Sequence, residues 1–493
     1  MIVERYPVQS NLLTWRVDYV RVTLWLLIAS YIAWFSYVSF RAHDLFLTNG
    51  FDFGIFDYIV WNNLHGHFFS GLFIGEKSHL SIHFQLILLP LTLLYLVWPS
   101  PKALLLVQSL VLGLGALPIY WLAEYRLNKW LGLLFALVYL LFPALQGANL
   151  AEFHTVPLAA GLLAFAYWYL VRGRWGWLLL FCGLAALCQE DVWLVVGMMG
   201  VYLWLTRRDR RGLLLALAGF GGFLVLSLWV IPGFAAGREV HFALRRYGAL
   251  GQSIPEILTT LITRPGFVLQ YIVSEPDRLR YLTNLLAPVA YLAVFDPLTL
   301  IIILPTVVMN VLSGLQTMYA LDRFQYSAII VPFVVAAAIN GTAWLVKTLH
   351  HRRGYALTFL YSLLAVALLV ATVGYHIRYG HTLLNRAFAL PTNRLHYQAG
   401  YDMLALIPPA AVVSAQSNLS PHLTHRPGVY LFPMLSSQEY GPAEYVALDF
   451  WGNLHPFEQA EAYNARVFEL RISGDYDVIF ERAGYILLKR RHR

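Results

Sequence analysis

Two aspartates in the segment FDFGIFDYIV, Asp52 and Asp57, are the first residues whose setting suggests chemistry. They lie five positions apart around Gly54, among side chains that are mostly aromatic or aliphatic. A carboxylate in such a half-apolar setting is a candidate general base, because burial raises its pKa toward the working pH. The alternative is that Asp52 caps a helix that begins near Gly54 and that Asp57 is solvated. The pattern leaves both interpretations open.

A second set of histidines and acids recurs at the ends of apolar runs. Imidazole and carboxylate groups can bind a polar substrate or ligate a metal ion. No tight motif such as H-E-x-x-H is present, so the sequence assigns no metal ligand, although a divalent metal stays open as a cofactor. Alternatively, the acids only occupy helix N-termini, where the helix dipole favours negative charge. The set consists of His83, Glu152, His154, Glu190 and Asp191.

Basic residues that could hold a phosphate occur later in the chain. Arg245 and Arg246 are adjacent, and a pair of guanidinium groups can bind a phosphate or pyrophosphate. The same arginines could equally reach lipid headgroups with their charged ends. Tyr326, beside the loop 313–325, has the same two interpretations as a substrate-binding or an interfacial residue.

The composition indicates which elements must position these residues. Of the 493 residues, 59% are hydrophobic and 13% are charged, whereas a soluble domain carries about 25% charged residues. Apolar runs of about 20 residues, each long enough to span a bilayer as a helix, recur along most of the chain. The net charge of +8 comes with basic residues in short loops, which indicates membrane topology and argues against a nucleic-acid partner.

The apolar runs predict an α-helical polytopic membrane protein with about eleven transmembrane helices and additional interfacial helices. Asp296-Pro297 divides the long run 281–312 into a hairpin of two short helices. The excess of Lys and Arg in short loops places the N-terminus in the cytoplasm and the C-terminus outside, provided that 80–98 does not cross the membrane. The other predicted spans are 18–40, 101–123, 130–147, 155–171, 175–189, 191–206, 212–232, 326–346 and 354–376.

Charge density divides the chain into a transmembrane domain, 1–376, and an extracytoplasmic domain, 377–493. The first contains two long outer loops, 41–100 and 233–280. The second alternates strand-like and helix-like stretches, which predicts a small α/β domain. Such a domain would cover a substrate cleft or bind a protein partner. The predicted strands are 411–416, 428–433 and 444–450, followed by a helix at 457–472 and a hairpin at 476–490 around Ala483-Gly484.

Five segments carry a resemblance to a known family: FDFGIFDYIVWNNLHG, SIHFQLILLPL, QGANLAEFHTVPLA, CQEDVWLVV and the C-terminal stretch that contains SNLSPHLTHRPGVYLFP, EYVALDF and YDVIFERAGYILLKR. With them the chain resembles a family of bacterial and archaeal predicted membrane proteins that carry a domain of unknown function, DUF2079. That family is distantly similar to the GT-C glycosyltransferases. The resemblance covers nearly the whole chain.

The resemblance implies an integral protein of the cytoplasmic (inner) membrane that uses a polyprenyl-phosphate-linked sugar as donor. GT-C enzymes place one acid in the first outer loop, which here is Asp52 with Asp57 as rival, and a second acid after the third span, which is Glu152. The expected activity is inverting sugar transfer at the outer leaflet. The alternative is a non-catalytic membrane subunit or scaffold that has kept the fold and contacts protein partners through its C-terminal domain.

Overall fold

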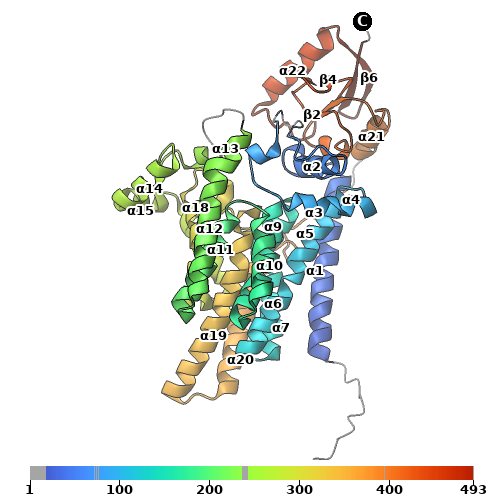
Figure 1. Cartoon of the computed structure of the whole chain (residues 1–493). Coiled ribbons are helices and arrows are strands. Elements are labelled where there is room, and N and C mark those ends of the chain that lie inside the picture. The colour runs from blue at the N-terminus through green and yellow to red at the C-terminus, as the bar shows by residue number, and fades with distance from the viewer. Residues whose placement is uncertain are drawn as a thin grey trace, which may run out of the picture.

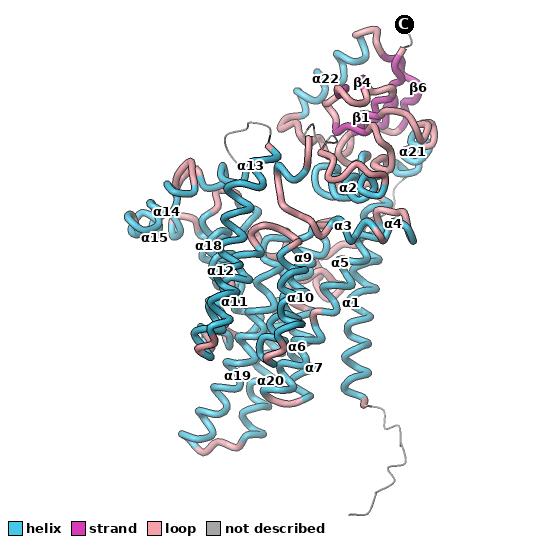
Figure 2. Tube along the Cα trace, in the orientation of Figure 1, coloured by secondary structure: helices cyan, strands magenta, loops and turns pink. Residues whose placement is uncertain are grey.

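Long apolar helices packed side by side form the larger part of the chain (Figure 1). The structure is a computed structural model, and it describes residues 18–71, 73, 75, 77–235, 242–392 and 395–491. A small domain with a β-sheet covers one end of this bundle (Figure 2). The residues at the N-terminus, which the sequence places in the cytoplasm, lie outside the described part. The mostly helical fold with a strand-containing C-terminal domain confirms the predicted fold class.

The helices of the bundle follow one another through short connections. Their caps explain several of their ends: the Asn128 side chain accepts from two backbone amides at the start of α7, and Gly173 ends α9 with a positive φ of 65°. The bundle contains α1 (Tyr19–Asp44), α5 (Lys102–Leu114), α6 (Ala116–Arg126), α7 (Lys129–Leu140), α8 (Pro143–Leu150), α9 (Thr155–Arg172), α10 (Trp175–Ala186), α11 (Val192–Arg207), α12 (Arg210–Val225), α17 (Pro297–Ile301), α18 (Leu304–Leu312), α19 (Val331–Arg353) and α20 (Leu357–Tyr379).

Within the described residues, six helices are long and apolar enough to span a membrane, or seven if the bent pair α7–α8 is one span. This number is smaller than the eleven predicted, because several predicted spans form shorter helices. Helices α10 and α11 contain 12 and 16 residues. The run 281–312 is broken at Pro297, as predicted, and α17 begins there with Asp296 as its cap. The run forms several short helical segments, however, and not the predicted hairpin of two helices. These shorter helices lie within the same bundle (Figure 1).

One end of the bundle carries the elements of the loop 41–100, which the sequence predicts to be the first outer loop. A single π-helical turn, η1 (Gly50–Gly54), leads into α2 (Ile55–Leu64), and η3 (His79–Ser81), α3 (Leu88–Thr92) and α4 (Leu94–Val97) follow. Helices α2, α3 and α4 lie at this end beside the C-terminal domain (Figure 1). Because α3 and α4 are five and four residues long, the stretch 80–98 forms no single span, in agreement with the prediction. The second long loop forms α13 (Ile231–Phe234), η5 (Phe242–Tyr247), α14 (Ile254–Thr263), α15 (Pro265–Val273) and α16 (Pro276–Leu286).

The C-terminal domain is built on a sheet with the strand order β2-β1-β5-β7-β6 among the described residues. β1 is parallel to β2 and β5, and β7 is antiparallel to β5 and β6. The turn between β6 and β7 lies at Ala483-Gly484, as predicted, with positive φ at both residues. The elements are α21 (Leu395–Leu404), β1 (Val413–Ala415), β2 (Val429–Leu431), β3 (Ser436–Ser437), β4 (Gly441–Pro442), β5 (Tyr445–Asp449), α22 (Ala460–Ile472), β6 (Tyr476–Arg482) and β7 (Tyr485–Arg490).

The two faces of this sheet have different partners. Alternate residues of a strand point to opposite faces, and in β5 Ala447 belongs to the core shared with the bundle, whereas Val446 and Leu448 belong to a separate core with α22. The shared core also contains Phe46, from the first outer loop. The C-terminal domain is therefore packed on the bundle through one continuous apolar core.

We predict that the C-terminal domain and the loop between α11 and α12 lie on opposite sides of the membrane, because the short basic loops favour the cytoplasm. A cysteine at Glu461, an exposed residue of α22, should react with a membrane-impermeant maleimide in intact cells, and a cysteine at Arg208 should react only after lysis. The native Cys182 and Cys188 are buried and give little background labelling. The reverse labelling pattern would show that the orientation in the membrane is opposite to the predicted one.

Candidate active site

Three of the residues singled out in the sequence meet where the bundle and the first outer loop join. Asp52 belongs to the π-helical turn η1, immediately before α2. Glu152 follows α8, and His154 precedes α9. The three residues come from two loops that are about 100 positions apart in the sequence, and the packing of α1, α5, α8 and α9 brings these loops together. Turns of π-helix occur frequently at functional sites.

Glu152 is held in an unusual conformation by the first outer loop. Its φ is +63°, a region that few non-glycine residues adopt and that costs free energy unless the surroundings enforce it. The carboxylate accepts hydrogen bonds from Asn49 N at 3.0 and 3.1 Å, from Asn49 Nδ2 at 2.7 Å and from Phe53 N at 3.3 Å. Burial and the charge of Asp52 raise the pKa of Glu152, whereas the hydrogen bonds from Asn49 lower it. The raising effects are larger, and the pKa is about 7.

Asp52 is the accessible carboxylate of the group, with a side chain 54% exposed. Its Oδ1 lies 3.5 Å from Nε2 of His154. The pKa of Asp52 is lowered, and not raised toward the working pH as expected from its half-apolar setting: burial raises this pKa, but His154, with a smaller contribution from His455, outweighs burial. Asp52 makes no capping hydrogen bond to α2, so the structure does not support the interpretation of this residue as a helix cap.

His154 is 7% exposed, and neither of its ring nitrogens makes a hydrogen bond within the described residues. A buried polar group without a partner costs free energy. The Nε2 atom faces Asp52, and the ring packs against Phe56 with centroids 5.6 Å apart. Nε2 therefore interacts with Asp52 itself, and Nδ1 remains available to a molecule that binds beside Asp52.

Asp57 lies in a different environment, although it is only five residues from Asp52. It is completely buried, and its carboxylate accepts hydrogen bonds from the hydroxyls of Tyr95 and Thr424 and pairs with His425 Nε2 at 3.2 Å. Thr424 and His425 belong to the C-terminal domain. The alternative that Asp57 is solvated is wrong, because this side chain is enclosed between α2, α4 and the C-terminal domain.

A second polar cluster forms around the start of α11. His83 Nδ1 lies 2.7 Å from Glu190 Oε1, and Phe84 N donates to Glu190 Oε2 at 3.0 Å. Burial raises the pKa of Glu190, but His83 outweighs it and the result is a lowered value. Burial and the neighbouring Glu190 raise the pKa of Asp191 to about 6. Within the described residues Asp191 Oδ1 has no hydrogen-bond partner.

Phe56 lies between the two clusters. Its ring centroid is 5.6 Å from that of His154 and 6.0 Å from that of His79, whose Nε2 is hydrogen-bonded to Gln85 at 2.7 Å. Gln85 in turn donates to Gln189, the neighbour of Glu190, at 3.2 Å. Six of the predicted site residues thus lie in two adjacent groups at one end of the bundle: Asp52, Glu152 and His154 in one, and His83, Glu190 and Asp191 in the other.

The two arginines of the second loop have different positions. Arg245 is exposed, whereas the guanidinium carbon of Arg246 lies 5.9 Å from the ring centre of Tyr326. Asp52 and Arg246 are both within electrostatic range of Tyr326, and Arg246 and Asp191 are within range of Tyr247. Arg246 and Tyr326 are thus adjacent, and the charges of Asp52 and Asp191 reach the tyrosines near Arg246, whereas Arg245 lies at the surface.

Three residues of the site were not predicted from the sequence. Asn49 holds Glu152, and its Oδ1 accepts a hydrogen bond of 2.6 Å from Asn453 Nδ2 in the C-terminal domain. The ring of His455 packs against Phe51 with centroids 4.7 Å apart. In the sequence, the one feature that points to Asn49 as a site residue is its position just before Asp52. Nothing in the sequence links it to a residue 404 positions away.

The side chains of the site do not form a metal-binding set. Among the residues that the structure describes, no group of three or more His, Cys, Asp or Glu side chains is arranged to hold a metal ion. Both oxygens of Glu152 already accept hydrogen bonds from the protein. The arrangement instead offers one exposed carboxylate, one imidazole with unsatisfied nitrogens and a nearby guanidinium.

Comparison with solved structures identifies the class of fold. The apo structure of ArnT from Cupriavidus metallidurans has a TM-score of 0.51 and 13% sequence identity, over 95% of this chain and 98% of ArnT. ArnT bound to undecaprenyl phosphate has a TM-score of 0.48 and 14% identity over the same shares. An oligosaccharyltransferase from Archaeoglobus fulgidus in the apo form has a TM-score of 0.44 and 14% identity, over 88% of this chain and 70% of the other. The chain is a membrane protein with a fold like that of the GT-C glycosyltransferases.

The family follows from the sequence. Residues 42–487 match the model of the family described as Predicted membrane protein (DUF2079). The chain belongs to this family, as the resemblance indicated. A search among curated proteins finds no match.

Proposed function

We propose that the protein is a glycosyltransferase that moves a sugar from a polyprenyl-phosphate donor to an acceptor hydroxyl at the outer leaflet. The observation that carries the proposal is the exposed carboxylate of Asp52 beside the unsatisfied imidazole of His154, on a fold like that of the GT-C glycosyltransferases. A carboxylate of lowered pKa is ionised at neutral pH, so it can accept a hydrogen bond from the acceptor hydroxyl and orient it. The lowered pKa also makes it a weaker base, so the proton passes to it only late, when the forming bond to carbon has made the hydroxyl strongly acidic.

In the proposed step the acceptor oxygen attacks the anomeric carbon of the sugar from the side opposite the phosphate. The new C–O bond forms as the bond between the anomeric carbon and the phosphate oxygen breaks. The lipid phosphate leaves with the bonding electron pair, and the proton of the acceptor hydroxyl passes to Asp52 and then to water. Phosphate is a good leaving group, so orientation and charge stabilisation account for most of the rate.

Separate residues would serve the two halves of this step. We assign the leaving phosphate to Arg246, which lies beside Tyr326, since a guanidinium pairs well with phosphate oxygens. Arg245, which is exposed, would only attract the negatively charged donor from a distance. His83, Glu190 and Asp191 would bind polar groups of the substrate. Glu152, whose oxygens are occupied by Asn49 and Phe53, would position η1 and Asp52.

Asp57 is not assigned a chemical role. Its carboxylate is enclosed by Tyr95, Thr424 and His425, so an acceptor has no access to it. We propose that this residue attaches the C-terminal domain to the first outer loop. The C-terminal domain would then cover the turn that carries Asp52 through the contacts of Asn453 with Asn49 and of His455 with Phe51.

The direct test is sugar transfer by the purified protein in lipid. Radiolabelled polyprenyl-phosphate sugars are supplied as donors, and release of polyprenyl phosphate is followed together with formation of a labelled acceptor. Hydrolysis to free sugar in the absence of an acceptor also counts as activity, because it breaks the same bond. Failure of every donor, with protein shown to be folded, would favour the non-catalytic subunit.

We predict that Asn49→Ala shifts the pH dependence of transfer toward higher pH. The Asn49 side chain donates to ionised Glu152 and so lowers its pKa, and its loss raises that pKa above about 7. If the ionised form holds η1 in place, the acid limb of kcat/KM against pH moves upward by roughly one to two units, the equivalent of one charge-assisted hydrogen bond. Glu152→Gln should abolish this limb. An unchanged limb in both variants would remove Glu152 from the mechanism.

A further inference from the structure

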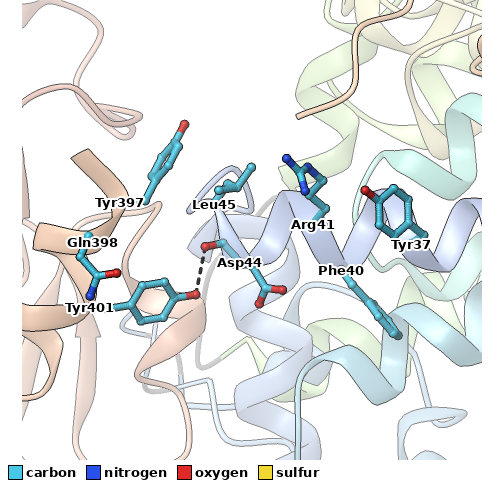
Figure 3. A pocket seen from close by; sticks show the side chains of 8 residues that line it. All are labelled: Tyr37, Phe40, Arg41, Asp44, Leu45, Tyr397, Gln398 and Tyr401. Carbon is cyan, nitrogen blue, oxygen red and sulfur yellow. Dashed lines mark hydrogen bonds between the residues drawn. The ribbon is translucent and has the colours of Figure 1, made fainter. Parts of the chain in front are cut away.

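A hollow unrelated to the acidic clusters lies between the last turns of α1 and the helix α21 (Figure 3). Its volume is about 480 Å³, which falls in the range of small-molecule sites. The walls are four aromatic side chains with two charged ones between them, contributed by the bundle and by the C-terminal domain: Tyr37, Phe40, Arg41 and Asp44 from α1, and Tyr397 and Tyr401 from α21.

The charges around this hollow favour an anion. Asp44 is neutralised by Lys102, whose Nζ lies 2.7 Å from its Oδ1. Arg41 donates through Nε to the carbonyl of Pro391, and within the described part of the chain no carboxylate pairs with it. The terminal nitrogens of Arg41 therefore remain as donors to a ligand. Because Lys102 outside the hollow offsets the charge of Asp44, the positive charge of Arg41 is left uncompensated within it. The planar fork of a guanidinium matches the oxygens of a phosphate.

The position of the hollow indicates that the phosphate belongs to a lipid. Helix α1 is a candidate membrane span that ends at Asp44, so Tyr37 and Arg41 lie in its last turns, where aromatic and basic residues meet lipid headgroups. The ring of Phe40 packs against Trp98 at the end of α4, with centroids 5.9 Å apart. Beside Trp98 a patch of strongly exposed apolar residues offers a surface to acyl chains: Leu93, Leu96 and Val97.

We propose that the hollow between α1 and α21 binds the phosphodiester headgroup of a membrane phospholipid. Arg41 holds the phosphate, the tyrosines enclose the headgroup, and the acyl chains extend over α4. Because Tyr397 and Tyr401 come from the C-terminal domain, the bound lipid contacts both parts of the chain. This site is independent of sugar transfer, and it is tested by binding alone.

Native mass spectrometry of the full-length protein in detergent, with added phosphatidylglycerol, tests the proposal. The wild type should retain one lipid at collision energies that remove the others. Arg41→Gln should weaken this binding about tenfold or more, the equivalent of one charge-assisted hydrogen bond. Arg378→Gln is the matched control, because Arg378 is exposed near the end of another apolar helix, beside Tyr379, and does not line the hollow.

Two further measurements separate a lipid headgroup site from a folding defect and from a site for free phosphate. Gln398→Trp fills the hollow from its exposed edge while Arg41 stays in place, so it should release the lipid even if Arg41→Gln disturbs folding through the contact with Pro391. Diacylglycerol, which lacks the phosphate, should not be retained, and inorganic phosphate at equal concentration should not displace the phospholipid. Three results would each overturn the proposal. They are retention of the lipid by Arg41→Gln and Gln398→Trp as strong as in the wild type, retention of diacylglycerol, and displacement of the phospholipid by inorganic phosphate.

Discussion

Replacement of Asp52 by asparagine is expected to lower the rate of sugar transfer by a factor of about 10² to 10⁴, the usual effect of removing a general base. Asparagine has nearly the same size, and the Asp52 side chain is half exposed, so the substitution should leave the fold intact. The loss should appear in kcat more than in KM, because the carboxylate is needed when the acceptor proton is released. The measurement is steady-state transfer with the donor that the wild type uses.

Two variants make this test specific. His154→Phe removes the nitrogens that face Asp52 and keeps an aromatic ring next to Phe56, so it should also reduce kcat, although less than Asp52→Asn. Arg245→Gln changes an exposed residue of the second loop and should have little effect on kcat. Full activity of well-folded Asp52→Asn would exclude Asp52 from the mechanism.

Asp57→Ala is expected to destabilise the protein by about 3–5 kcal/mol, the usual cost of removing one partner of a buried ion pair. The substitution leaves the hydroxyls of Tyr95 and Thr424 and the ring of His425 without their common acceptor. Since two of these three residues belong to the C-terminal domain, the contact of this domain with α2 and α4 should loosen before the apolar core that it shares with the bundle is lost. Limited proteolysis of the segment 380–394 and thermal unfolding followed by tryptophan fluorescence would detect the change.

The pairing with His425 also makes the attachment sensitive to pH. Burial lowers the pKa of His425, but Asp57 outweighs it and the result is a raised value. A group whose pKa is raised by folding stabilises the folded state below its ordinary pKa, about 6.5 for histidine, and loses this contribution as the pH rises through the higher folded value. The C-terminal domain should therefore be released more readily at alkaline pH.

Asp57→Asn is the control for this pH dependence. Asparagine can keep one hydrogen-bond acceptor for the hydroxyls but has no charge, so burial alone should hold the pKa of His425 below its ordinary value, and the difference between neutral and alkaline pH should shrink. An unchanged pH profile of proteolysis in Asp57→Asn would show that another group controls the attachment. Transfer activity is not needed for either measurement.

Much of the fold could be predicted because it depends on local signals. Apolar runs predicted the bundle, and the turn residues Ala483 and Gly484 located the hairpin of the C-terminal domain. The number of spans was less predictable, because an apolar run does not say where a helix ends. Helix α10 contains only 12 residues within a longer apolar run, and 281–312 is divided into several short helices.

The site was predictable only where topology alone brings residues together. The ends of membrane helices on one side must meet, and this rule placed Asp52, Glu152 and His154 near one another. It could not separate Asp52 from Asp57, because the difference lies in partners far away in the sequence. Thr424 is 367 positions from Asp57, and hydrophobic periodicity contains no information about such pairs.

The hydrogen bond between Asn49 and Asn453 has a consequence for biosynthesis. Residue 49 emerges from the ribosome early, whereas residue 453 is synthesised only when most of the chain has been made. Until then the loop that holds Glu152 lacks its second support, and Asp57 lacks its partners in the C-terminal domain. A nascent chain whose helices are already in the bilayer thus has an unfinished site. Assembly of the C-terminal domain is the step that completes it, so a truncated product would occupy the membrane without the organised site.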